Sequence, residues 1–422
     1  MQPNAPLEAR VSALLAGDPE LMADPFPTWN ELRDTRPVLR VPGAVVISRH
    51  RDVRELLGDN YVLYSRQQNR HAPRFEMARQ TFSPKARESF DYVMDQEYGQ
   101  LVRMDPPDHP RVRKVLVPAF AARSLAREME DKVRARVDQN LDAFAALGAE
   151  QGSVDFKQFA YTFPLEVLGD LLGIPLDDLE SIHGWAKVIA ENKLNADSEE
   201  AAISADAAYH GLLNYVDELI ARQQQSGKTT GVVAALLAAV DAGQINHDET
   251  RQMLALMIFA GHETTSNLLA IGMMELLRNP EQWRLLCEAP AERTPAAVEE
   301  LLRYVTPANF TQYVTAKPLE LDGIEIDTGE AVLGISASAN RDPEVFERPN
   351  ELDILRSDSR NHVSLGLGPH FCLGAGLARM EANMMFSAIA ERFPNAQLTD
   401  DPIQWGGRSL RTPLTLPLVL NP

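Results

Sequence analysis

The sequence predicts one large, mainly α-helical domain with a small β portion. Apolar residues recur at helical spacing over most of residues 107–280. Runs rich in β-branched residues, typical of strands, are short and lie near 38–48, 311–335 and 414–419. The chain has 422 residues, of which 45% are hydrophobic, and no internal repeat or convincing linker divides it. We therefore expect a single helix-rich domain with a large buried core.

The elements are expected in a definite order. Residues 1–25 should form a loosely ordered tail, and the folded domain should cover 26–422. Residues 61–104 lack a clear period, which is typical of a functional or mobile segment. Turn signals at 173–175 and 226–228 interrupt the helical region. The remaining predictions are a helix over 27–33, strands over 38–41 and 44–48, a helix over about 292–304, strands within 311–335, an irregular stretch over 340–363, a helix ending near 393 and a strand over 414–419.

Composition and charge limit the classes of function. The chain has 41 basic and 60 acidic residues, a net charge of −19, which argues against a general nucleic-acid binder. Two cysteines cannot form a disulfide framework and fit a reducing cytoplasm. The N-terminus lacks the features of a signal peptide, and no segment reaches the ~18 consecutive apolar residues that cross a bilayer. We expect a cytoplasmic protein without a membrane span.

One of the two cysteines, Cys372, lies in a glycine-rich segment, Ser364–Gly376, which leads into a predicted helix. A thiol at a helix start faces free backbone N–H groups and the positive end of the helix dipole, and both lower its pKa. Gly366 and Gly368 remove side chains where the backbone must approach a flat, bulky group. The segment therefore suits an axial thiolate ligand of a metal, whereas a buried structural cysteine in a glycine-rich turn is the alternative.

The longest periodic segment runs from Asn246 to Arg278 and would span roughly 45 Å as a helix. Asn246 is a candidate N-cap with Glu249 three residues later. Its middle, Ala260–Thr265, is polar although apolar runs flank it. Threonine hydroxyls there can bond back to earlier carbonyls and open the helical ladder.

An opened groove in this helix could hold water or a diatomic ligand. Thr264 would then be a hydrogen-bond donor, and Glu263 would supply protons from solvent. Alternatively, Glu263 and Thr265 simply face a polar neighbour. His262 is expected to be a hydrogen-bonded helix residue rather than a ligand.

Two further groups of charged residues stand at helical spacing. Glu300 and Arg303 share a helix face among apolar neighbours, which favours a buried pair over a solvated one, and Arg356 could complete it. His109 and Arg113 also share a face and could clamp a carboxylate, although a solvent-facing basic patch is the alternative.

These motifs together resemble the cytochrome P-450 family of heme-thiolate monooxygenases in its soluble bacterial form. The resemblance covers nearly the whole chain in order: His109 with Arg113, Ala260–Thr265, Glu300–Arg303, Asn340–Pro343 with Arg356, and the cysteine loop with Leu377–Glu381. It implies the cytochrome P-450 fold, with heme b between the long central helix and the helix after the cysteine loop.

The resemblance also implies residue roles. Cys372 would be the axial thiolate ligand of heme iron, tuned by N–H groups near its sulfur. The heme would be held by His109, Arg113 and His370 at its propionates, with Gly261 and Gly374 beside it. Glu263 and Thr264 would be the oxygen-activating pair, and Glu300, Arg303 and Arg356 a structural triad. The substrate pocket would be lined from residues 61–104, 307–311 and 410–414, with Phe82, Phe90, Tyr98, Asn309, Phe310 and Thr412 as candidates.

Two positions depart from the family pattern. Leu365 stands where the family usually has Phe, so altered packing under the heme is expected. Many relatives carry an arginine for a propionate near Gln312–Tyr313, and neither residue supplies that charge. Heme binding would then depend more on His109, Arg113 and His370.

The expected activity is insertion of one atom of O2 into a small apolar organic substrate, by hydroxylation or oxidative dealkylation. The chain has no flavin or iron–sulfur region, so electrons would come from a separate ferredoxin and its reductase, docking near Arg111–Lys114. The alternatives are a peroxide-driven peroxygenase, a non-catalytic heme sensor, and a heme-free enzyme with Cys372 as nucleophile.

Overall fold

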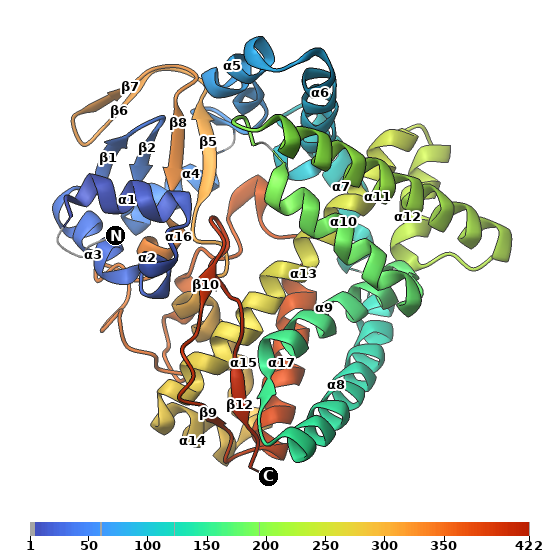
Figure 1. The fold of residues 1–422 in the computed structure, drawn as a ribbon, viewed down its shortest axis with the longest axis vertical. Helices are drawn as coiled ribbons and strands as arrows, with labels where there is room; N and C mark the ends of the chain where they lie inside the picture. Colours follow the sequence, from blue (N-terminus) through green and yellow to red (C-terminus); the bar gives the residue numbers. More distant parts are fainter. Residues whose placement is uncertain (1–4, 60, 122, 194, 422) are drawn as a thin grey trace.

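The structure is a computed structural model that describes residues 5–59, 61–121, 123–193 and 195–421. Helices fill the right and lower parts of the molecule, and the main β-sheet lies at the upper left near the N-terminus (Figure 1). The prediction of a mainly α domain with a small β portion is confirmed. No helix in the described ranges is long and apolar enough to cross a membrane.

The predicted helical region is divided where the turn signals stand. Gly173 and Gly227 end two helices with φ angles of +71° and +66°, the left-handed region that glycine adopts without strain. The helices of this region are α7 (Asp108–Ala121), α8 (Arg123–Gln151), α9 (Phe156–Leu172), α10 (Leu179–Asn192), α11 (Glu199–Ser226), α12 (Gly231–Asp241), α13 (His247–Arg278), α14 (Pro280–Glu288) and α15 (Pro290–Val305), with the short η3 (Leu176–Asp178).

The N-terminal residues correct the expectation of a loosely ordered tail. Residues 7–23 form α1 (Leu7–Ala16) and α2 (Pro19–Ala23), followed by α3 (Phe26–Thr35). Val11 and Leu14 are buried on one face of α1, and Arg10 donates to Thr28 Oγ1 (3.2 Å) and Glu31 Oε2 (2.6 Å). Burial of that face against the core stabilises helices too short to persist alone.

The main sheet has the strand order β1-β2-β8-β5-β3. Its strands are β1 (Val38–Val41), β2 (Ala44–Ile47), β8 (Ala331–Gly334), β5 (Thr311–Thr315) and β3 (Tyr64–Ser65). β2 and β8 are parallel and the other pairs antiparallel. β6 (Leu319–Leu321) and β7 (Ile324–Ile326) form a hairpin, and β4 (Val154–Asp155), β9 (Gln397–Leu398), β10 (Trp405–Gly406), β11 (Thr412–Pro413) and β12 (Pro417–Val419) form two small sheets. The predicted early strands and those within 311–335 are confirmed, and the last strand is shorter than predicted.

The segment 61–104 is largely helical, which corrects the expectation of an aperiodic stretch. After α4 (His50–Gly58) it contains η1 (Gln67–His71), α5 (Pro73–Thr81), α6 (Pro84–Tyr98) and η2 (Leu101–Arg103). Phe82, Phe90 and Tyr98 are buried with Phe75 in a separate apolar cluster. These three side chains form the core of the segment, because its helices pack on one another and on α11, so we no longer assign them to the substrate pocket.

Helix α13 runs through the middle of the molecule, packed on α9, α11, α15 and α17 (Ala375–Arg392) (Figure 1). The predicted capping box is present, since Asn246 Oδ1 accepts from Glu249 N and Asn246 N donates to Glu249 Oε2, both at 2.8 Å. Thr264 and Thr265 donate to the carbonyls of Ala260 and Gly261, as expected. The helix is nevertheless continuous, so the expected opening of its ladder is wrong for this state.

Candidate functional site

The cysteine loop follows α16 (Ser336–Ala339), an irregular stretch and η4 (Ser359–Asn361), and contains η5 (Gly368–His370). Cys372 N donates to Leu365 O at 2.8 Å and closes the loop. Gly366 and Gly368 have φ angles of +69° and +58°. A Cβ on Gly368 would lie 3.1 Å from Gly58 Cα, so glycine here lets the loop lie directly against the end of α4. A Cβ on Gly374 would meet nothing within 4 Å.

The Cys372 thiol is half-buried just before α17. Burial raises its pKa, and this effect outweighs the Gly374 N–H and the charges of Arg113 and Arg379, which lower it. The N–H group at the helix start lowers the thiol pKa, as expected, but burial outweighs it, so the helix start does not by itself favour the thiolate. The fold positions the sulfur, and a positively charged ligand has to supply the remaining stabilisation of its charge.

The loop is anchored to α15 through Asn340 and Ser364. Asn340 Nδ2 donates to Ser364 Oγ (2.7 Å), and Ser364 Oγ donates to Leu302 O (2.6 Å). Val363 N donates to Asn340 Oδ1 (2.8 Å). These buried bonds fix the point at which the irregular stretch becomes the cysteine loop.

The predicted triad is assembled beside this anchor. Glu300 accepts from Arg303 Nε and Nη2, both at 2.7 Å, and from Arg356 Nε at 3.1 Å. Glu300 and Arg303 side chains are 0% exposed. The spare N–H groups of both arginines donate to backbone carbonyls between residues 340 and 351, so the triad fixes the shape of the stretch that carries the loop.

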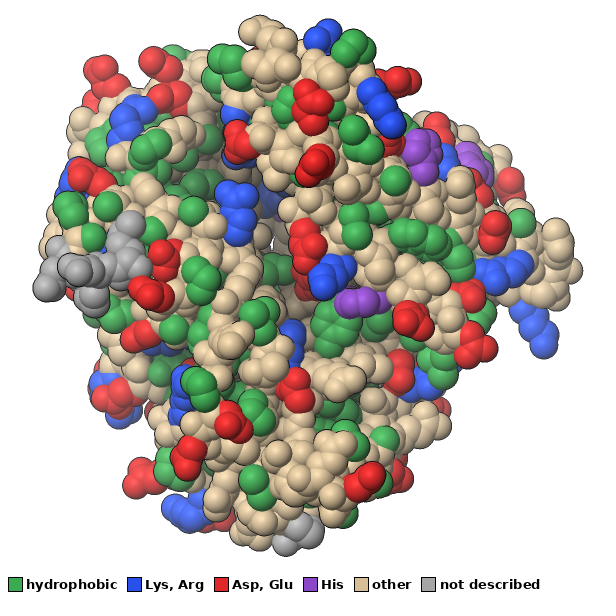
Figure 2. All heavy atoms as spheres, viewed as in Figure 1, with side chains coloured by type: hydrophobic (Ala, Val, Ile, Leu, Met, Phe, Trp, Pro, Cys, Tyr) green, Lys and Arg blue, Asp and Glu red, His purple; other side chains and the backbone are tan. Residues whose placement is uncertain are grey.

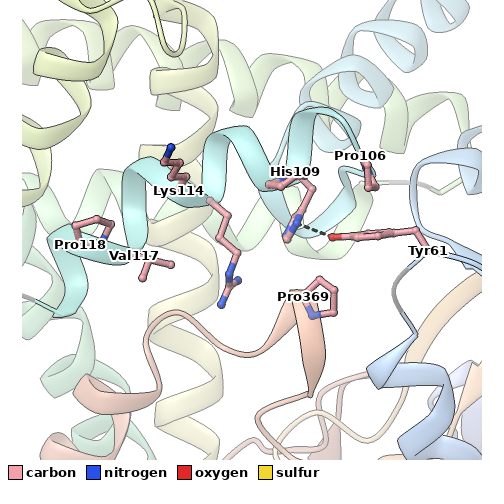
Figure 3. A pocket seen from close by; sticks show the side chains of 9 residues that line it. Tyr61, Pro106, His109, Lys114, Val117, Pro118 and Pro369 are labelled. Carbon is pink, nitrogen blue, oxygen red and sulfur yellow. Dashed lines mark hydrogen bonds between the residues drawn. The ribbon is translucent and has the colours of Figure 1, made fainter.

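His109 and Arg113 stand four residues apart on α7, as predicted, and His109 points toward the cysteine loop near Pro369 (Figure 3). Arg113 Nη2 donates to Phe371 O at 2.7 Å. The His109 and His370 rings are 4.2 Å apart between centroids. A 2.6 Å hydrogen bond joins His109 Nδ1 to the Tyr61 hydroxyl, which the sequence did not suggest as a site residue. Tyr61 has a φ of +63°, a rare conformation for a tyrosine that no sequence pattern signals.

Some polar atoms of this histidine and arginine cluster have no hydrogen-bond partner within the described protein. His109 Nε2 and His370 Nε2 are buried without a hydrogen-bond partner. Burial, with neighbouring guanidinium groups, lowers the pKa of His109 to about 4 and that of His370 to about 2, so both rings are neutral. In the tautomer in which Tyr61 donates to Nδ1, His109 Nε2–H is a free donor. A pocket of about 700 Å³, lined by Tyr61, His109, Arg113 and Pro369 among others, opens between α7 and the loop (Figure 3).

These features fit a heme. Neutral histidine donors and a guanidinium without a carboxylate partner in the described ranges suit the propionates. In the middle of α13, Ala260 and Gly261 are exposed although most of the neighbouring residues of this helix are buried. A Cβ on Gly261 would meet only Leu168 Cδ1, at 3.7 Å. The middle of the central helix thus borders open space.

Glu263 and Thr264 are half-buried beside that space. Burial raises the pKa of Glu263, and the nearby ammonium groups of Lys157 and Lys193 oppose the rise. Lys157 is buried, donates to Ser266 Oγ (2.9 Å) and Asn267 Oδ1 (3.1 Å), and has its pKa lowered to about 8 by burial. This buried lysine was missed because it lies on α9, about a hundred residues from Glu263. His262 is buried with Nε2 3.0 Å from Tyr161 O, as predicted for a structural histidine.

Two of the other pocket candidates, Asn309 and Thr412, lie at the β10–β11 hairpin. Thr412 Oγ1 accepts from Asn267 Nδ2 of α13 at 2.9 Å. Asn309 is buried, and its backbone N donates to Ser409 O at 2.8 Å. Phe310 packs on the main core, as does Leu365, the residue that departs from the family pattern. Figure 2 shows that this face of the molecule is hollowed near its centre, between the β-rich part and the helices.

The run Arg111–Lys114 offers less free charge than the sequence suggests. Arg111 pairs with Glu249 (2.5 Å) and Asp108 (2.7 Å), and Val112 is buried. Arg113 is turned toward the loop, which leaves Lys114 as the exposed unpaired cation of this described run.

Comparisons with known proteins agree on one family. A model of the cytochrome P450 family matches residues 199–288 and 292–406. The chain is 33% identical to nocardicin C N-oxygenase of Nocardia uniformis, over 95% of this chain and 97% of that protein. It is 34% identical to vitamin D3 dihydroxylase of Streptomyces griseolus, over 88% of this chain and 87% of that protein. The ligand-free crystal structure of CYP164A2 of Mycobacterium smegmatis superposes with a TM-score of 0.83 and 28% identity, covering 98% of this chain and 100% of that one.

Proposed function

This chain belongs to the cytochrome P450 family, and on that premise we propose that it hydroxylates, or oxidatively dealkylates, an apolar organic molecule with electrons from a ferredoxin. It is a monooxygenase, and its cofactor is heme. The overall reaction is RH + O2 + 2 e⁻ + 2 H⁺ → ROH + H2O. The observation that carries the proposal is the Cys372 loop, closed by the bond from Cys372 N to Leu365 O and facing two histidines whose buried Nε2 atoms lack hydrogen-bond partners.

We assign the heme-holding roles from this geometry. Cys372 would be the iron ligand, and His109, Arg113 and His370 would hold the propionates, because their free donors converge beside the loop. Gly374 N–H would donate to the sulfur and reduce its charge. The chemistry that heme supplies when bound is the reductive activation of O2.

Glu263 and Thr264 would deliver the protons that the reaction consumes. Burial raises the pKa of Glu263, which favours its protonated form, so its carboxyl is the group that would carry a proton and release it. Thr264 Oγ1 lies 2.8 Å from Ala260 O on the exposed part of α13 and can turn to donate toward that space. Lys157, with a pKa of about 8, can return a proton to Glu263 from the α9 side.

The substrate class follows from the relatives and the apolar surroundings. The similar proteins include a steroid C26-monooxygenase of Rhodococcus jostii and the vitamin D3 dihydroxylase, named for rigid polycyclic or secosteroid molecules. Phe310 and the leucines of the cysteine loop, Leu365 and Leu373, are partly buried apolar side chains packed on the main core. We therefore propose a terpenoid or sterol-like substrate, with Asn309 and Thr412 as the polar groups that orient it.

A spectrum tests the assignment of Cys372. The reduced carbon monoxide adduct of the wild-type protein should show the far red-shifted Soret band of a thiolate-bound heme. Cys372→His should abolish that band, and Cys287→Ser, at the other half-buried cysteine, should leave it unchanged. Wild-type protein without heme, or a Cys372→His variant with the same band, would contradict the proposal.

A binding screen tests the substrate class. Ferric protein would be titrated with sterols, terpenoids and linear fatty acids, and the shift caused by displacement of water from the iron would be recorded. Sterols should bind with the lowest Kd. Tighter binding of linear chains would contradict the proposed class without affecting the assignment of Cys372.

A further inference from the structure

Strand β5 carries Gln312 and Tyr313, where the family resemblance leads us to expect an arginine for a propionate, and the fold brings an arginine from elsewhere to Tyr313. β3 and β5 are antiparallel, with Tyr64 opposite Thr315 and Ser65 opposite Val314. The next residue along the chain, Arg66, is therefore brought to Tyr313. A residue 247 positions away in sequence thus fills the region in which β5 supplies no cation.

Arg66 is held firmly in this position. Its Cζ lies 4.3 Å from the centroid of the Tyr313 ring, and Nη2 donates to the Tyr313 hydroxyl at 2.8 Å. Nη1 donates to Val102 O at 3.1 Å. Asp105 is not its ion-pair partner, because that carboxylate accepts from the backbone N–H groups of Arg66 and Gln67 and from the Ser65 hydroxyl.

The guanidinium has unused hydrogen-bonding capacity. Arg66 is only 8% exposed, and its Nε is buried without a partner. A guanidinium has five N–H groups, and the two bonds above use two of them. Among the described residues no carboxylate pairs with Arg66. A buried cation is retained when a counter-charge compensates for its lost hydration, so this site calls for an anion that the protein does not supply.

Arg66 belongs electrostatically to the histidine cluster. Its charge contributes to the lowered pKa of both His109 and His370 and also acts on Tyr61. Arg66 and Arg113 together bring two positive charges to this side of the site, and heme carries two propionates. The charges balance only when Arg66 is counted with Arg113.

We propose that Arg66 binds a heme propionate and takes over the role of the arginine missing from β5. The proposal rests on the proposed function, since it requires heme at the Cys372 site. Tyr313 is then a positioning residue: its ring and hydroxyl hold the Arg66 guanidinium, and it does not itself contact the cofactor. A purely structural role for Arg66, tying η1 to β5, is the competing explanation.

The first measurement is the rate of hemin release from ferric holoprotein to an excess of a heme-scavenging apoprotein. Arg66→Gln should release hemin about 10–100-fold faster, the effect expected on losing a hydrogen bond to a charged group. Arg66→Lys should release hemin at a rate between those of the wild type and Arg66→Gln. The matched control is Arg70→Gln on the same segment, where Arg70 pairs with Asp95 at 2.8 Å on the surface. That variant should release hemin at the wild-type rate.

Heme dimethyl ester separates a propionate contact from a structural role. Esterification removes both carboxylate charges, so Arg66→Gln should release the ester no faster than the wild type does. The double variant Arg66→Gln with Tyr313→Arg, which returns an arginine to β5, should restore slow release of unmodified hemin. An equal acceleration by Arg66→Gln for hemin and for its ester would overturn the proposal and leave the proposed function intact. Wild-type protein that binds no hemin would overturn both.

Discussion

Neutralising Glu300 should destabilise the protein far more than a typical surface change. In Glu300→Gln the two guanidiniums of Arg303 and Arg356 stay buried without their carboxylate, and the amide NH2 faces Arg N–H donors at 2.7–3.1 Å. Breaking a buried pair by removing one partner costs about 3–5 kcal/mol. Domains are typically stable by about 5–15 kcal/mol, so the variant should fold with a large loss of stability.

The measurement is urea unfolding of holoprotein, followed by far-ultraviolet circular dichroism and by heme absorbance. The control is Glu351→Gln, whose side chain pairs with Arg348 at 2.7 Å with both groups more than half exposed. Glu351→Gln should lower the free energy of unfolding by less than about 1 kcal/mol. In Glu300→Gln the heme signal should be lost at lower urea than the helical signal, because the triad fixes the stretch before the cysteine loop. A free energy of unfolding for Glu300→Gln within the range of the control would refute this reasoning.

Three further outcomes concern proton and electron delivery. Thr264→Ala should lower the product formed per electron while electron uptake from the ferredoxin continues, and an unchanged ratio would favour the peroxygenase alternative. Lys157→Met removes a cation that lowers the Glu263 pKa, so the limb of the turnover–pH profile that requires protonated Glu263 should move to higher pH; a shift to lower pH would contradict this role. Lys114→Glu should raise the KM for ferredoxin at low salt, and Arg111→Glu should act mainly through stability because Arg111 already pairs with Glu249. Equal KM effects from both would contradict that distinction.

Much of the site could be predicted because its parts depend on local spacing. Glu300 and Arg303, or His109 and Arg113, share a face whenever their segment is helical, and the capping box at Asn246 marks where α13 begins. The segment 61–104 resisted prediction because the apolar face of α6 packs on α11 and on the neighbouring short helices. Its pattern therefore follows partners that are distant in sequence.

Site residues that strand pairing brings together could not be predicted either, because the paired strands are distant in sequence. Nothing near Arg66 in the sequence indicates that two residues of β3 will pair with β5, and that short ladder alone decides which side chain meets Tyr313. In the proposed role of Arg66, the pairing supplies a cation that Gln312 and Tyr313 of β5 do not. A buried anion in low-dielectric surroundings requires a positive charge beside it. Any helix or strand that brings a guanidinium to that place can supply this charge.

The same reasoning applies to Cys372. A helix start was expected to prepare the thiolate, yet burial raises the thiol pKa because the local N–H donor and two neighbouring guanidiniums stabilise the anion less than lost water destabilises it. What the loop provides is position: a closed turn, a glycine that allows contact with α4, and an anchor to the buried triad. A site that holds its ligand atom rigidly but leaves it protonated binds strongly only to a group that displaces the proton, as a metal ion does from a thiol. The half-buried Cys287 also has its pKa raised by burial but lies in α14 without such a loop, so the fold distinguishes the two cysteines by position rather than by acidity.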